Sequence, residues 1–441
     1  MDNQINLFEV IYPKYKITKP IRLIEFFAGY GSQALALKYL GVKFEHWKIC
    51  EWAVKSIQAY KDIHFTNEYH PYGFIEESKE KLANYLYKLG ISSNYNETMT
   101  LEQIKRLKHE DLCTICENIY ITNNLVNIQQ VKGKDLEIVD TDKYDYILTY
   151  SFPCQDLSLA GKGKGMSDTS TRSGMLWEVE RILQECKDLG ELPQILLMEN
   201  VPQVHSQDNL EDFNKWKYKL EELGYKNYFQ DLIATDYGIP QTRNRCFMVS
   251  ILGDYSYTFP KPIPLKLKLK DMLENKVDEK YYIEDDLLQH IIKTKQEHTE
   301  YTQYDRYNGE FEQLCRVWKD KAPTLHTKSK DIKIYEYKKQ LTETLINVKN
   351  IKKTQMLDLY NRNAVADGLC QTVDMGYHNS MRLLDNCRIR KITCKETFRL
   401  MGVKDEDYDK VAKNQSDSSL YHLAGDSIVV DVLMAIFKEL L

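Results

Sequence analysis

A cysteine, a glutamate and a pair of arginines stand beside predicted strands in the first 259 residues. Cys154 lies in the tripeptide PCQ after the apolar segment 144–150, and Glu199 follows the apolar segment 194–198. Loops at the carboxyl ends of parallel strands are where α/β sheets bind ligands. A thiol near cationic groups becomes a thiolate nucleophile. A carboxyl group at the end of an apolar strand is desolvated, so its pKa rises and it can donate a proton.

Each of these residues also has a purely structural interpretation. A lone cysteine is more often a buried small apolar residue, and a glutamate at a strand end often pairs with a cation. Arg243 and Arg245, in the segment QTRNR, are two residues apart before the apolar segment 246–252. On a strand they would face the same side. They could hold a phosphate or a carbonyl oxygen, or be surface charges.

The first strand–helix–strand unit predicts a nucleoside-binding site. A strand at 21–26 is followed by the loop FAGYGS and a helix at 32–40. Gly29 and Gly31 let the backbone approach a ligand, and the helix N-terminus favours negative charge. Glu51, about 20 residues further on, stands where a ribose-binding acid is expected. This unit alone does not distinguish NAD from S-adenosylmethionine.

The alternation of strands and helices predicts an α/β fold with six or seven strands over residues 1–259. A Lys-, Tyr- and Asn-rich stretch at about 60–126 is interpreted as a helical insertion, with helical pieces around 76–89 and 101–119. The patterning changes near Pro260. We expect a second, smaller mixed domain at 260–387 and a C-terminal segment, 388–441, that opens with a helix capping box in TCKE.

Composition excludes several classes of protein. The chain has 441 residues, of which 43% are apolar, enough for roughly two to three domains and too many for a disordered chain. No run of 18 apolar residues occurs, so we expect no membrane span. Ten cysteines without a recognisable secretory signal indicate a reduced, cytoplasmic protein. Cys113 and Cys116 form one CxxC without further spaced ligands, so we expect no metal, and the absence of a coiled-coil seam favours a monomer.

Charge is distributed unevenly along the chain. The net charge is −5, but residues 321–353 hold nine lysines and three acidic residues, a local net charge of +6. A basic stretch of this density could meet phosphates even on an acidic protein. A solvated surface is the alternative interpretation.

The order of the motifs identifies a family resemblance. FAGYGS, EW, PCQ, ENV and QTRNR follow one another, each beside a predicted strand, and RIRKITCKETFRLMG and LAGDSIVVDVLMAIF close the chain. This pattern resembles the cytosine-5 DNA methyltransferases of bacteria and phages, in particular the subgroup that includes bacterial CpG methyltransferases. The resemblance covers 21–252 and 388–440. Residues 260–385 match the position of the family's variable target-recognition domain.

The resemblance implies a Rossmann-like methyltransferase sheet that uses S-adenosyl-L-methionine and acts on double-stranded DNA. Cys154 would add to carbon 6 of a flipped cytosine, and Glu199 would protonate or hydrogen-bond ring N3. The implied catalytic residues are Cys154, Gln155, Glu199, Asn200, Arg243 and Arg245. The implied cofactor residues are Phe27, Gly29, Tyr30, Gly31, Glu51, Trp52, Asn127, Ile128, Pro153, Asp426, Ser427 and Ile428. The expected DNA contacts are Gly161, Lys162, Lys164, Lys328, Lys330 and Lys333.

Three positions depart from the family pattern, and three other functions stay open. Ser32 replaces a glycine, Asn127 replaces an aspartate that touches adenine, and Asp426 replaces an asparagine. The first alternative is the same chemistry on RNA, and the second is a catalytically silent DNA-binding protein. The third is an NAD oxidoreductase, which is supported by Gly29, Gly31, Ala34 and Glu51 but leaves PCQ and ENV unexplained.

Overall fold

A six-stranded mixed sheet forms the centre of the computed structural model, which describes residues 12–65, 73–153, 174–282 and 390–441, together with the backbone of short strands between 356 and 389. The strand order is β2-β1-β3-β4-β6-β5. Strands β1 to β4 are parallel, and β6 is antiparallel to both β4 and β5. The predicted α/β sheet is therefore confirmed, with six strands. Their bounds are β1 Ile21–Phe26, β2 Phe44–Cys50, β3 Asp145–Tyr150, β4 Ile195–Asn200, β5 Tyr225–Ile233 and β6 Asn244–Leu252.

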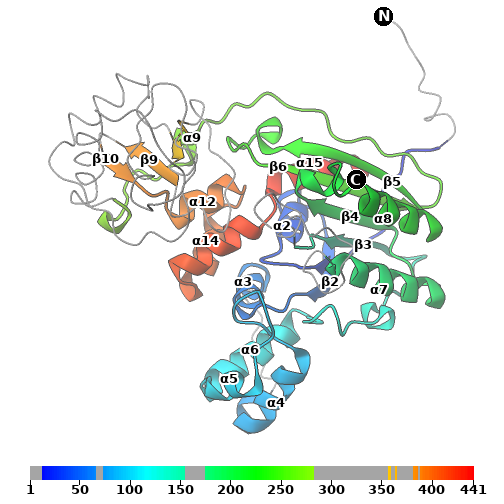
Figure 1. Ribbon diagram of the computed structural model, residues 1–441, viewed down its shortest axis with the longest axis horizontal. Helices are drawn as coiled ribbons and strands as arrows, with labels where there is room; N and C mark the ends of the chain where they lie inside the picture. Colours follow the sequence, from blue (N-terminus) through cyan, green and yellow to red (C-terminus); the bar gives the residue numbers. More distant parts are fainter. Residues whose placement is uncertain are drawn as a thin grey trace, which may run out of the picture.

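Helices cover both faces of the sheet (Figure 1). Within β4, Ile195 and Leu197 join one buried apolar cluster, whereas Leu196 and Met198 join another. Alternate residues of a strand point to opposite faces, so a strand buried on both sides reads as one continuous apolar run. The first cluster packs against helices α2 (Ser32–Tyr39) and α15 (Val430–Leu440). The second packs against α7 (Met175–Leu189) and α8 (Leu210–Glu222).

The expected helical insertion forms a small separate core. It follows α3 (Val54–His64) and contains α4 (Lys79–Leu89), α5 (Leu101–Arg106) and α6 (His109–Ile121), which lie together beyond the edge of the sheet (Figure 1). The single helix expected around 101–119 is divided in two, because a second helix begins after Lys108, whose backbone N–H donates to the Asp111 carboxylate. Cys113 and Cys116 lie on α6 and are buried in this core.

The C-terminal segment folds back onto the sheet as three more helices before α15. The predicted capping box is confirmed: Thr393 caps α12 (Cys394–Leu400), and the Glu396 side chain returns to the Thr393 N–H. Two further helices, α13 (Asp405–Val411) and α14 (Asp417–Asp426), lead to α15.

One stretch near the C-terminus bears on the expectation that the chain has no membrane span. The stretch Asp417–Leu440 has the length and hydropathy of a membrane-crossing helix, with a mean hydropathy of 1.6 in its most apolar window. The exclusion rested on uninterrupted apolar runs, which this stretch lacks although its average is high. In the fold, 72% of that window is buried. The stretch divides into α14 and α15 and belongs to the core that covers the sheet.

A second, four-stranded sheet precedes α12. It has the antiparallel order β10-β9-β7-β8, with β7 Met356–Asp358, β8 Asn363–Ala364, β9 Met381–Asp385 and β10 Arg388–Arg390. It lies beside α9 (Leu269–Met272) and α12 (Figure 1). The domain boundaries near 260 and 388 stay predictions. The basic stretch 321–353 lies outside the described residues.

Candidate functional site

The loop at residues 27–31, named the glycine loop here, connects β1 to α2 in an unusual backbone conformation. Phe27, Gly29 and Gly31 have φ angles of 56°, 55° and 82°. A Cβ on Gly31 would lie 2.5 Å from His64 Nε2, whereas a Cβ on Gly29 would meet nothing within 4 Å. Packing therefore requires glycine at position 31. At position 29 the backbone faces open space that a ligand can approach, and the left-handed φ again favours glycine.

A buried polar network supports the glycine loop from below. The Glu25 carboxylate accepts hydrogen bonds from the Tyr60 hydroxyl at 2.5 Å and from the Ala34 N–H at 3.3 Å. His46 Nδ1 lies 2.9 Å from the same hydroxyl oxygen. Burial raises the pKa of Glu25 to about 7 and lowers the pKa of His46 to about 4. The two side chains are therefore most easily buried in their neutral forms.

Glu51 ties the end of β2 to the glycine loop. Its carboxylate accepts from the Gly29 N–H at 2.9 Å and from the Ala53 N–H at 2.8 Å. Burial raises the pKa of Glu51 to about 7 against these hydrogen bonds, and the charge of Asp426 raises it further. Two carboxyl groups thus interact unfavourably at this point.

The C-terminal segment closes the glycine loop from the other side. The Tyr30 hydroxyl donates to Ser427 Oγ at 2.7 Å, and the Ile428 N–H donates to Ser32 Oγ at 3.4 Å. Arg243 Nη2 donates to the carbonyl oxygens of Gly425 at 3.0 Å and Ser427 at 2.8 Å. The Tyr30 ring is thereby buried. Its side chain holds the C-terminal segment, and its backbone forms part of the glycine loop.

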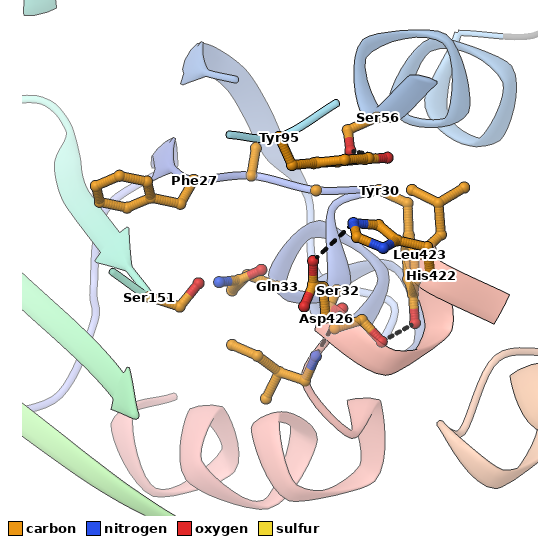
Figure 2. Close-up of a pocket in the computed structure, with 14 residues that line it drawn as sticks. Phe27, Tyr30, Ser32, Gln33, Ser56, Tyr95, Ser151, His422, Leu423 and Asp426 are labelled. Carbon is orange, nitrogen blue, oxygen red and sulfur yellow. Dashed lines mark hydrogen bonds and ion pairs between the residues drawn. The ribbon is translucent and has the colours of Figure 1, made fainter. Parts of the chain in front are cut away.

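These segments enclose a pocket, named the glycine-loop pocket here (Figure 2). Six of the residues that the family resemblance assigns to the cofactor line it: Phe27, Gly29, Tyr30, Asp426, Ser427 and Ile428. The other eight lining residues are not among the predicted cofactor residues, and they include Ser56, Tyr95, Ser151 and His422. Ser56, Tyr95 and His422 belong to no motif that the sequence analysis identified.

Other predicted cofactor residues lie around the pocket without lining it. Trp52 packs against the core of the insertion, and Ile128 belongs to the core under α7. The Asn127 side-chain oxygen accepts from the Gln129 N–H at 3.1 Å. Gly31 leaves room for His64, and the Glu51 carboxylate accepts from the Gly29 N–H. Pro153 directly precedes Cys154. Their roles toward a cofactor stay predictions.

A second cluster, named the Glu199 corner here, forms where β4 and β6 meet. Because the strands are antiparallel, Asn200 at the end of β4 pairs with Cys246 near the start of β6. Glu199 lies 3.1 Å from Arg245 Nε, and only 10% of its side chain is exposed. Burial raises the pKa of Glu199, an effect that the charges of Arg245 and then Arg243 oppose.

Asn200 links the Glu199 corner to the chain just before Cys154. Its Nδ2 donates to the Phe152 carbonyl oxygen at 3.0 Å. Both Asn200 and Phe152 are buried, so this bond fixes where the chain leaves the sheet after β3. Asn200 therefore positions the start of the PCQ segment.

The two arginines of QTRNR have different partners. Arg245 pairs with Glu199, whereas Arg243 donates to backbone carbonyls of the C-terminal segment. These contacts therefore do not support the prediction that the two arginines face the same side and share one ligand. Arg243 precedes the first residue of β6, so the alternation of a strand does not govern its direction.

The remaining predicted residues lie outside the part of the chain that the structure describes. They are Cys154, Gln155, Gly161, Lys162, Lys164, Lys328, Lys330 and Lys333. The described residues on either side, Pro153 and Gly174, mark where the PCQ loop leaves β3 and enters α7.

Within the described ranges, His205, Asp231 and Cys246 have metal-ligand atoms within 4.8 Å of one another. His205 Nε2 is hydrogen-bonded to Asp231 Oδ1 at 2.9 Å, and burial raises the pKa of the Cys246 thiol. A metal needs the thiolate form of cysteine. These features do not favour metal binding at this place.

The charges at the glycine-loop pocket favour a cationic ligand. Asp426 raises the pKa of both Glu51 and Glu199 and lines the glycine-loop pocket itself. Glu51 and Asp426 thus repel each other at the pocket, whereas the Glu199 carboxyl group is paired with Arg245. A sulfonium or ammonium group would relieve their repulsion, whereas the pyrophosphate of a dinucleotide would increase it.

Comparisons with known proteins agree with this arrangement. Residues 99–441 match the family model of C-5 cytosine-specific DNA methylases. The chain is 31% identical over 96% of its length to the orphan methyltransferase M.SssI of Spiroplasma monobiae, covering 98% of that protein. It is 30% identical over 95% of its length to the type II methyltransferase M2.ScrFI of Lactococcus lactis subsp. cremoris, covering 99% of that protein.

Solved structures of low sequence identity share the fold. The Dnmt2 methyltransferase of S. pombe superposes with a TM-score of 0.52 at 14% identity, over 95% of this chain and 98% of that one. A putative DNA modification methyltransferase encoded within an E. coli prophage gives the same TM-score at 15% identity, over 95% and 98%.

Proposed function

The chain belongs to the C-5 cytosine-specific DNA methylase family, and from this premise we propose the reaction and the residues that carry it. The protein transfers a methyl group from S-adenosylmethionine to carbon 5 of a cytosine flipped out of a short duplex DNA sequence. The observation that carries the choice of cofactor is the pair of carboxyl groups at the glycine-loop pocket: Asp426 lines it, and Glu51 holds its loop. S-adenosylmethionine brings a positive sulfonium to such a site.

The residues around the pocket suit this cofactor. Gly29 leaves open space at the loop, and Glu51 and Asp426 supply negative charge. Phe27, Ser427 and Ile428 complete the walls. When bound, the cofactor supplies an electrophilic methyl group. The chain's own part is to exclude water and to hold the donor between the glycine loop and the C-terminal segment.

The covalent steps take place on the cytosine. The Cys154 thiolate adds to ring carbon 6, while Glu199 donates a proton or hydrogen bond to ring N3. The electron pair that reaches carbon 5 then forms the new carbon–carbon bond to the methyl group, and the methyl–sulfur bond breaks with its electron pair left on a neutral thioether sulfur. Loss of the carbon 5 proton to a base, with water in that role, expels the Cys154 sulfur from carbon 6 and restores the aromatic ring.

The described contacts support these roles. Burial raises the pKa of Glu199, so that its protonated form persists closer to neutral pH, as a general acid requires. Arg245 pairs with this carboxyl group, and we assign it the role of holding the oxygen of the base. Asn200 fixes the Phe152 carbonyl and hence the start of the loop that carries Cys154.

DNA contacts are proposed for two lysine-bearing segments. Flipping the base costs a few kcal/mol, which contacts to the DNA backbone would offset. Gly161 would let the loop after Cys154 close over the base, while Lys162 and Lys164 would touch phosphates. The basic stretch 321–353, in the proposed target-recognition domain, would bind phosphate near the target.

We propose that the enzyme works as a monomer in the cytoplasm of a bacterium or phage-infected cell.

The test is bisulfite-type sequencing of plasmid DNA from a methylation-free host that expresses the chain, with Cys154→Ala as the matched control. We expect cytosines in one short motif to be protected by the intact protein alone. Protection that persists with Cys154→Ala would contradict the covalent mechanism. A soluble protein that binds S-adenosylmethionine but protects no cytosine would contradict the DNA reaction, and a tRNA substrate would then be tested by competition.

The salt dependence of DNA binding tests the basic stretch. Changing Lys328, Lys330 and Lys333 to Ala should weaken binding and reduce the slope of log affinity against log salt by about one unit per lost phosphate contact. An unchanged slope would place the DNA elsewhere on the protein.

A further inference from the structure

The helical insertion sends one loop, residues 92–97, back toward the glycine-loop pocket. Ser92 forms a parallel bridge with Ala53. The Ser92 N–H donates to the Trp52 carbonyl oxygen at 2.8 Å, and the Val54 N–H donates to the Ser92 carbonyl oxygen at 2.9 Å. The loop is therefore attached to the chain directly after Glu51, whose carboxylate holds the glycine loop.

Hydrogen bonds within the loop hold Tyr95 in a strained backbone conformation. The φ angle of Tyr95 is 62°, in the left-handed region that tyrosine rarely adopts. Its N–H donates to Ser92 Oγ at 3.1 Å, and that hydroxyl in turn donates to the Glu97 carbonyl oxygen at 2.7 Å. Strain of this kind persists where the surroundings over-determine it, and it is concentrated at functional sites.

The Tyr95 side chain meets the C-terminal segment at the pocket. Its ring centroid is 3.9 Å from that of His422 on α14, with 37° between the ring planes. Its hydroxyl lies 3.4 Å from Ser56 Oγ on α3. His422 Nε2 is in turn 3.1 Å from Asp426 Oδ2. Figure 2 shows Tyr95 and His422 together on one side of the pocket, with Phe27 at the other end.

The location distinguishes this contact from ordinary core packing. Tyr95, His422 and Ser56 all line the glycine-loop pocket, and Tyr95 and His422 are both only half-buried. Burial and the charges of Glu51 and Asp426 raise the pKa of Tyr95, so its hydroxyl stays neutral beside those carboxyl groups. The ring thus stands at the pocket, next to the same carboxyl groups that favour a cationic ligand.

We propose that Tyr95 and His422 form a clasp over the bound cofactor, by which the insertion controls cofactor retention. This inference rests on the proposed function and assigns a role to the insertion. Tyr95 is a positioning residue: it joins the insertion to the C-terminal segment and forms one wall of the pocket. An aromatic wall shields a bound ligand from water and attracts its cationic groups. Losing the wall should speed the release of the cofactor more than it slows the chemistry.

The experiment measures the dissociation constants of S-adenosylmethionine and S-adenosylhomocysteine for the full-length protein by titration calorimetry. Tyr95→Ala should weaken both by about tenfold, in line with the loss of one well-packed aromatic contact. Tyr95→Phe keeps the ring and should bind nearly as the unaltered protein does. Tyr87→Ala is the matched control, because Tyr87 is a 50% exposed tyrosine of α4 in the same insertion.

Two further measurements separate a clasp from a merely structural role. Tyr95→Ala should raise KM for the cofactor with little change in kcat, and it should leave DNA affinity unchanged. In a double-mutant cycle, His422→Ala should add little to the loss of cofactor affinity caused by Tyr95→Ala, because the effects of substituting two residues in contact are not additive. Fully additive effects would overturn the clasp.

The outcomes distinguish this inference from the proposed function. If the unaltered protein does not bind S-adenosylmethionine, the proposed function fails. If it binds the cofactor but Tyr95→Ala binds equally well, the clasp alone is overturned. Equal losses for Tyr95→Ala and the Tyr87→Ala control would also overturn it, because they would reflect general damage to the insertion.

Discussion

The glycine-loop pocket and the Glu199 corner are built in different ways. The pocket joins five segments that are distant in the sequence: the glycine loop, α3, the insertion, the chain directly after β3, and the C-terminal segment that includes α14. The Glu199 corner needs two hydrogen-bonded neighbouring strands, β4 and β6, and one ion pair. Cofactor binding should therefore depend on tertiary contacts made by distant parts of the chain. The acid–base chemistry should depend on local register and charge, so each can be damaged separately.

The sharpest test of this separation is Glu199→Gln. Removing the proton donor should reduce kcat by about 10²- to 10⁴-fold, the usual contribution of a general acid. The dissociation constant of S-adenosylmethionine should stay within about twofold, because the site of damage is the acid and not the pocket. Single-turnover methylation and titration calorimetry measure the two quantities.

Glu178→Gln is the control for Glu199→Gln, since Glu178 also pairs with an arginine, Arg181, but lies on the outer helix α7. It should leave both quantities unchanged. Near-normal methylation by Glu199→Gln would contradict the assigned role of Glu199.

The two arginines of QTRNR provide the second test. Arg243→Ala removes the donor to two buried backbone carbonyls, so it should lower the free energy of unfolding by about 2–4 kcal/mol and weaken cofactor binding. Arg245→Ala should change stability and cofactor affinity far less, and mainly reduce methylation. Urea unfolding and calorimetry of both variants check the contrast.

Arg245→Ala also has a pH signature. The Arg245 charge lowers the pKa of Glu199, so its removal should raise that pKa further. The alkaline limb of kcat, where the acid loses its proton, should then move to higher pH. Either an equal loss of stability in the two arginine variants or a shift of the alkaline limb of kcat to lower pH would show that the glycine-loop pocket and the Glu199 corner are not separate.

The smallest expected effect concerns the network below the glycine loop. The pKa of Glu25 is about 7 in the fold against 4.5 ordinarily, so the folded state binds an extra proton between these values. Glu25 thus contributes stability that is fully present below about pH 4.5 and is lost as the pH rises through about 7. The carboxyl group is fully buried, and the loss should be about 1–3 kcal/mol.

The measurement is the unfolding free energy of the natural chain and of Glu25→Gln between pH 5 and 8. The difference between the two should grow in favour of Glu25→Gln as the pH rises. His46, whose pKa is lowered to about 4, has the opposite pH dependence, but it is present in both proteins and cancels in the difference. A difference that does not vary with pH would contradict the raised pKa of Glu25.

Much of this site could be predicted from the order of residues along the chain. PCQ and ENV were placed at the ends of strands, and β3 and β4 confirm those places. The helix start at Thr393 was readable because a capping box is a local pattern of two side chains. The side chain of Tyr30 was not readable in this way. It was assigned to the cofactor, yet only 1% of the residue is exposed and its hydroxyl reaches Ser427.

Tyr95 and His422 show the limit most clearly. The Ser- and Asn-rich segment around Tyr95 predicts a turn, but no local pattern predicts that this turn returns toward the glycine loop. His422 lies on α14, for which the sequence analysis made no prediction. Their contact exists because the insertion is anchored beside Glu51 and α14 is anchored by Arg243.

The sequence by itself determined which elements form, in what order, and which reactive side chains follow which strands. Apolar periodicity and capping are local, and parallel strands bring their carboxyl ends to one edge. Only the tertiary structure decided that Arg243 holds the C-terminal segment while Arg245 meets Glu199, and that the insertion reaches the pocket. Such contacts join distant segments, and their geometry follows from how the packed elements fill space rather than from the conformational preference of any one segment.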